Sequence, residues 1–111
     1  MASDLSFVEY VCDQLQGTPR LSFRRMFGEY ALYLGNKVVA LACDNQLFVK
    51  PTEAGRQFLG EPEEGLPYPG AKPWFLIDEE LDDGERLSAL LRLTERELPE
   101  PKPKKRKKVA R

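Results

Sequence analysis

The chain has 111 residues, of which 41% are hydrophobic and 32% charged, enough for one domain with a single small core. It contains no histidine, which removes the usual general base at neutral pH and the commonest metal ligand. Two cysteines, Cys12 and Cys43, are too few for a disulfide scaffold and cannot fill a zinc site alone. We therefore expect two buried thiols in a reducing cytoplasm.

Hydropathy predicts a soluble, cytoplasmic protein with no membrane partner. The first ten residues include Asp4 and lack a basic start followed by an apolar run, so no secretion signal is expected. The longest apolar run, VVALAC at 38–43, is far too short to cross a bilayer.

A first helix is expected over residues 4–16. Ser6 and Glu9 have the spacing of a capping box, although Ser3 or Asp4 could start the helix a turn earlier. Apolar side chains then repeat at helical spacing, at Val8, Val11, Cys12 and Leu15. Gly17 suits the left-handed conformation past the end of a helix, and Pro19 prevents its continuation.

The pattern then changes to the alternation of strands, at 20–26, 30–34, 37–43 and 46–50. Gly35-Asn36 and Asp44-Asn45 separate the last three of these, and such residues tolerate the positive φ of tight hairpin turns. Three consecutive strands joined in this way predict an antiparallel meander, to which 20–26 adds a fourth strand.

The second half of the chain adds two helices and one strand. Thr52 is placed to cap a short helix at 53–59, and Asp82 or Asp83 to cap a final helix that ends at Pro99. Between them, the glycine-, proline- and acid-rich segment 60–73 predicts a loop, and WFLI at 74–77 predicts a fifth strand. The order α-β-β-β-β-α-β-α predicts an α+β fold, a five-stranded antiparallel sheet with helices packed on one face.

The stretch RRMFGEYALYL at 24–34 raises the question of a phosphate loop. Such a loop needs several glycines leading from a strand into a helix, whereas here one glycine, Gly28, separates two strand-like runs. We interpret Gly28 as a turn or bulge. Arg24 and Arg25 are neighbours on a strand, so they should point to opposite faces, more often solvated or ion-paired than bound to nucleic acid. They remain candidate secondary basic contacts.

No catalytic, cofactor or metal site is predicted. The acidic clusters EPEE at 61–64 and DEELDD at 78–83 are typical of solvated loops and helix caps, and Cys12 has no histidine to activate it. Tyr68, Trp74 and Phe75 could form a stacking platform for single-stranded nucleic acid, but a half-buried strand explains them more simply.

The C-terminal segment 99–111 is predicted to be a disordered tail after a domain at 1–98. Residues 102–111 hold seven of the 17 basic residues and no acid, which leaves a formal charge of −8 on the rest of the chain. The tail therefore favours polyanions, DNA or RNA, with these candidate contacts: Lys102, Lys104, Lys105, Arg106, Lys107, Lys108 and Arg111. The alternative is a tail that only solubilises the protein or docks on its own body.

The run at 24–34, the following KVVALACDNQLFVK at 37–50 and the preceding FVEYVCDQLQG at 7–17 resemble the N-terminal domain of the TfoX/Sxy family over about residues 5–98. The resemblance implies a five-stranded α+β fold similar to secretion chaperones and no catalysis. It also implies a role in bacterial transcriptional regulation and competence, in which family members act with the cyclic-AMP receptor protein. Those regulators carry a second, helix-hairpin-helix-like domain where this sequence has its basic tail. A transcription regulator or a second copy of the chain is thus the expected protein partner.

Overall fold

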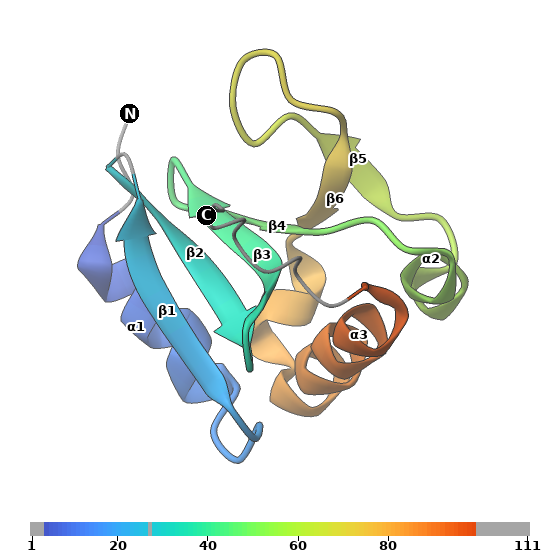
Figure 1. Ribbon diagram of the computed structural model, residues 1–111, viewed down its shortest axis with the longest axis horizontal. Coiled ribbons are helices and arrows are strands. Elements are labelled where there is room, and N and C mark those ends of the chain that lie inside the picture. Colours follow the sequence, from blue (N-terminus) through green and yellow to red (C-terminus); the bar gives the residue numbers. More distant parts are fainter. Residues whose placement is uncertain (1–3, 27, 100–111) are drawn as a thin grey trace, which may run out of the picture.

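A computed structural model describes residues 4–26 and 28–99 as an α+β fold, with helices packed against an antiparallel sheet (Figure 1). The elements, in chain order, are α1 (Leu5–Gln14), β1 (Leu21–Met26), β2 (Glu29–Leu34), β3 (Lys37–Cys43), β4 (Gln46–Val49), α2 (Glu53–Leu59), β5 (Glu63–Gly65), β6 (Trp74–Ile77), the 3-10 helix η1 (Glu79–Asp82) and α3 (Gly84–Glu97). In the described part of the chain, no helix has the length and hydropathy needed to cross a membrane.

The sheet has six strands in the order β1-β2-β3-β4-β6-β5, and every pairing is antiparallel. The predicted α+β class and antiparallel sheet are confirmed, with one strand more than the five expected. The additional strand, β5, lies in the segment predicted as a loop and pairs with β6. Its residues Glu63–Gly65 have no apolar alternation that could have indicated a strand.

The predicted turns are confirmed. Gly28 follows β1 with a φ of 81°, so the glycine of the arginine-rich stretch serves a bend between two strands. Gly35 has a φ of 64° between β2 and β3. Asp44 and Asn45 both have positive φ, 55° and 56°, between β3 and β4. Two consecutive left-handed residues match the right-handed twist of the strands that they join.

Two of the predicted helix caps are confirmed and one is not. The Thr52 hydroxyl accepts a hydrogen bond from the Gly55 amide at 3.0 Å, and the Asp83 carboxylate accepts one from the Arg86 amide at 3.2 Å. The capping box expected at Ser6 is absent because α1 takes the earlier of the two expected starts: its N-cap is Asp4, whose side chain makes no capping hydrogen bond.

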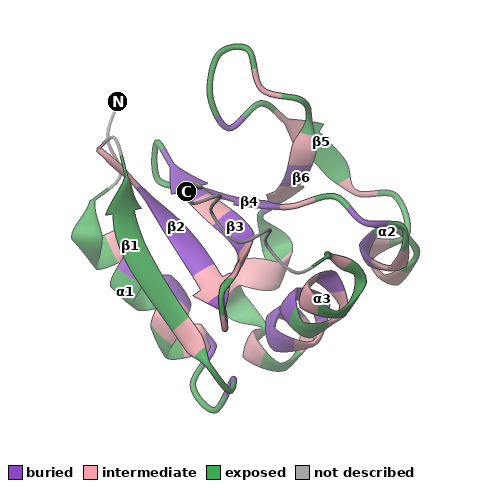
Figure 2. Ribbon diagram, viewed as in Figure 1, coloured by how far each residue is buried: buried purple, intermediate pink, exposed green. Residues whose placement is uncertain are grey.

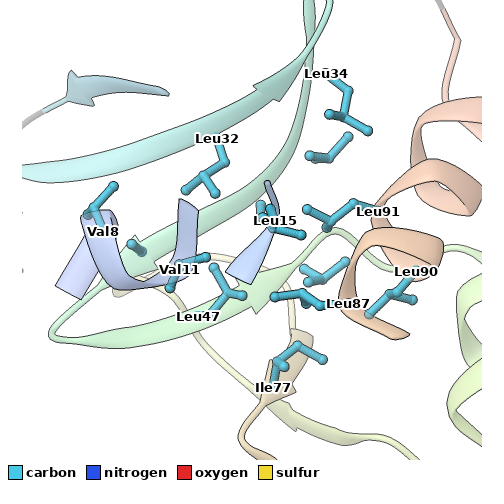
Figure 3. Close-up of a cluster of buried hydrophobic side chains, with 14 of the residues drawn as sticks. Val8, Val11, Leu15, Leu32, Leu34, Leu47, Ile77, Leu87, Leu90 and Leu91 are labelled. Carbon is cyan, nitrogen blue, oxygen red and sulfur yellow. The ribbon is translucent and has the colours of Figure 1, made fainter. Parts of the chain in front are cut away.

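The core lies between the helices and one face of the sheet, here called the helix face (Figure 3). Val8, Val11 and Leu15 of α1 and Leu87, Leu90 and Leu91 of α3 pack on sheet residues that include Leu32, Leu34, Leu47 and Ile77. A register shift beside Leu32 marks a bulge that brings the consecutive residues Val39 and Ala40 into this core. The helices thus pack on one side of the sheet, as predicted.

The C-terminal end of α3 is tied to the rest of the domain by charged side chains. The Lys37 side chain is 10% exposed, and its ammonium donates hydrogen bonds to the carbonyl oxygens of Glu95 and Leu98, at 2.9 and 2.8 Å. The Glu97 carboxylate accepts from the first amides of α2, those of Glu53 and Ala54, at 3.0 and 2.9 Å. These contacts satisfy backbone groups that helix ends leave unpaired.

Candidate functional site

A groove of about 990 Å³ lies on the other face of the sheet, here called the open face. Its floor comes from β1, β3 and β4, where Met26, Leu41, Cys43 and Phe48 line the groove. Its opposite wall is the segment Leu66, Pro67, Tyr68 and Pro69, which precedes β6 and projects beyond the sheet in Figure 1. The groove is therefore a cleft between a sheet face and a loop.

The floor is apolar because the central strands are apolar on both faces. Leu41 and Cys43 alternate with core residues Ala40 and Ala42, and Phe48 lies between two core residues of β4. Phe48 is only 4% exposed, and a side chain at Gly65 would meet its ring at 3.1 Å. Gly65 thus lets β5 lie close to this ring.

The rim of the groove is acidic. Glu29 and Asp44 stand at one side, and the Asp44 amide donates a hydrogen bond to the Glu29 carboxylate at 3.1 Å. Burial, followed by the charges of Glu29 and Asp44, raises the pKa of the Cys43 thiol to about 11. The thiol is therefore neutral at physiological pH, and the thiolate form that would act as a nucleophile is disfavoured.

Arg24 and Arg25, the predicted secondary basic contacts, lie on opposite faces of β1, as expected. Arg24 is opposite Ala31 on the open face, and its guanidinium is 5.8 Å from the centre of the Tyr33 ring. Arg25 is opposite Tyr30 on the helix face. Both are exposed but on opposite faces of the sheet, so they do not form one basic patch. The seven predicted tail contacts, Lys102 to Arg111, and the predicted disorder of that tail lie outside the described residues.

The aromatic residues weighed as a stacking platform are dispersed. Phe75 is fully buried on the helix face, whereas Trp74 lies on the open face with the Lys50 ammonium 5.9 Å from its ring centre. Tyr68 is 54% exposed on the loop wall of the groove. A single platform built from all three rings is therefore excluded.

The acidic clusters have structural contacts. The Asp82 carboxylate accepts a hydrogen bond from the Tyr10 hydroxyl, which raises the pKa of Tyr10, and Asp83 caps α3. Glu64 forms an ion pair with Arg56 at 2.8 Å. Across residues 4–26 and 28–99, no three or more cysteine or acidic side chains are grouped in a way that would hold a metal ion.

Comparison with known proteins supports the resemblance seen in the sequence. Residues 13–98, most of the described chain, match the TfoX N-terminal domain. The chain is also 49% identical over 107 residues to a Spirochaeta aurantia protein described as an uncharacterized 12.7 kDa protein in the trpE 5′ region. That alignment covers 96% of this chain and 93% of the relative. The chain thus belongs to the TfoX N-terminal domain family.

Proposed function

We propose that this protein is a non-catalytic regulatory or adaptor domain, whose basic tail holds it near nucleic acid while the folded body binds a protein partner. One observation carries the proposal: seven of the 17 basic residues fall in the last ten, and the rest of the chain has a formal charge of −8. The resemblance to the TfoX/Sxy co-regulators supports a regulatory role in the cytoplasm, and the groove on the open face offers a place for the partner.

The tail would bind by electrostatics without reading sequence. Lysine and arginine side chains that neutralise phosphates release condensed counterions, so affinity falls as salt rises. If about five cations engage phosphates, the logarithm of the binding constant should fall with the logarithm of salt at a slope of roughly −4 to −5. The dissociation constant should be about 10⁻⁴ to 10⁻⁶ M near physiological salt, with little preference among sequences.

Fluorescence anisotropy with a labelled oligonucleotide tests this proposal. Between 50 and 200 mM salt, the affinity of the full chain is expected to fall roughly 250- to 1,000-fold. A variant that lacks residues 100–111 is expected to lose binding at both salt concentrations and to keep its thermal unfolding midpoint.

The matched control is the double variant Arg24→Gln and Arg25→Gln, which removes two positive charges from the body and none from the tail. It is expected to bind like the unaltered chain. Binding that survives deletion of the tail but is lost in the double variant would contradict the tail's role and place the contact on β1.

A further inference from the structure

One edge of the sheet is exposed along a whole strand. β1 is the first strand in the sheet order and pairs with β2 along one side, and all its residues except Leu21 are exposed (Figure 2). Phe23 and Met26 are each 37% exposed, and both belong to this strand. An exposed strand edge presents backbone donors and acceptors to which another chain can pair.

The hydrogen-bonding direction of this edge follows from its pairing with β2. The Gly35 amide donates to the Arg20 carbonyl at 2.9 Å, so Arg20 and Gly35 are a hydrogen-bonded pair. In an antiparallel ladder, hydrogen-bonded and non-hydrogen-bonded pairs alternate. The backbone groups of Ser22 and Arg24 therefore point towards β2, whereas those of Leu21, Phe23 and Arg25 point away from it.

We propose that β1 pairs antiparallel with β1 of a second copy, around a twofold axis at Phe23, so that the two six-stranded sheets become continuous. In this register Phe23 lies opposite Phe23 of the second copy, and Leu21 lies opposite Arg25. All three outward-pointing residues then form hydrogen-bonded pairs. The arrangement is self-complementary, as a twofold interface must be.

The arginines select this register. With the axis at Phe23, Arg24 lies opposite Ser22 of the second copy, and Arg25 lies opposite an aliphatic side chain. If the axis moves one residue towards the C-terminus, Arg24 faces Arg24, and one residue further Arg25 faces Arg25. If it moves one residue towards the N-terminus, Arg24 faces Arg20. Like charges directly opposite each other on paired strands are destabilising, so these registers are disfavoured.

The apolar contact across the axis also favours a second copy over solvent. The Phe23 ring packs edge-on against Tyr30, with ring centres 5.8 Å apart, on the helix face. Pairing at the axis would place the two Phe23 rings side by side and cover their exposed edges. An interface of one short strand per copy is small, so the dimer should be weak and its population should depend on protein concentration.

Disulfide trapping in the full chain tests both the pairing and its register. In a hydrogen-bonded pair the Cα atoms lie about 5.5 Å apart, within the range that a disulfide bridges. Phe23→Cys should therefore form a covalent dimer under mild oxidation. In the same register the two residues 22 are offset along the strands, with Cα atoms about 8 Å apart, beyond that range. Ser22→Cys, also exposed on the same strand, is the matched control, because it leaves both arginines of β1 in place.

We expect the Phe23→Cys variant to cross-link at least tenfold faster than Ser22→Cys, with the unaltered chain as the baseline for Cys12 and Cys43. Sedimentation analysis of the unaltered chain should show a concentration-dependent dimer. Equal cross-linking of the two variants, faster cross-linking of Ser22→Cys, or a monomer at every concentration would overturn the proposal. The dimer interface lies within β1 and not in the tail. Failure to find the dimer can therefore be distinguished from failure of the tail to bind nucleic acid.

Discussion

Replacing Phe75 by alanine is expected to lower the free energy of unfolding by about 3–5 kcal/mol. The Phe75 side chain is fully buried on the helix face of β6. A methyl group added at Gly55 would lie only 3.3 Å from its ring, and the Arg56 guanidinium is 5.2 Å from the ring centre. Truncation removes the ring from this narrow space and leaves a cavity between the sheet and α2. Denaturant-induced unfolding measures the loss.

Tyr68→Ala is the control for this substitution, because Tyr68 is also an aromatic residue, in the loop that precedes β6, but is 54% exposed. Its loss is expected to change stability by no more than about 0.5 kcal/mol. A Phe75→Ala protein as stable as Tyr68→Ala would show that the ring does not fill the space between β6 and α2.

Replacing Gly84 by alanine is the second substitution with a large expected effect, about 1–3 kcal/mol of lost stability. Gly84 is the first residue of α3, and a side chain there would overlap the carbonyl oxygen of Gln14 at the end of α1. The obstacle is backbone rather than a flexible side-chain tip, so one of the two helices must shift. Thermal or denaturant unfolding gives the difference in stability.

Glu85→Ala tests whether the effect comes from the close approach or from alanine in the first turn of α3. Glu85 is the next residue and is exposed, and its loss removes only a favourable interaction with the helix dipole, less than about 1 kcal/mol. If Gly84→Ala were neutral or stabilising, α1 and α3 would not be in contact at this point.

The local chemistry of the sequence predicted most of the fold. The hairpins depend on residues that accept positive φ, Gly35 and the pair Asp44-Asn45, and these are recognisable without tertiary information. The helix caps at Thr52 and Asp83 also depend only on residues close in the sequence, because each side chain accepts a hydrogen bond from the amide three residues later. In contrast, β5 is a strand because β6 lies beside it, and Glu63–Gly65 carries no periodic signal of its own.

The groove was not predicted, because its two walls come from parts of the chain more than 15 residues apart. A partial signal was present: Leu41 and Phe48 are large apolar residues at positions that alternate with the core residues of β3 and β4. Apolar side chains on both faces of a strand indicate a second contact surface or a buried strand, and periodicity alone does not separate these. The opposite orientation of Arg24 and Arg25, which depends only on the strand period, was predicted correctly.

NMR tests most directly whether nucleic acid contacts the basic tail rather than the folded body. The amide signals of the full chain would be followed while an unlabelled oligonucleotide is added at low salt. We predict that the shift changes are confined to residues 100–111 and disappear when salt is raised. Changes centred on the open face around Arg24 and Tyr33, with the last residues unmoved, would contradict the proposed tether.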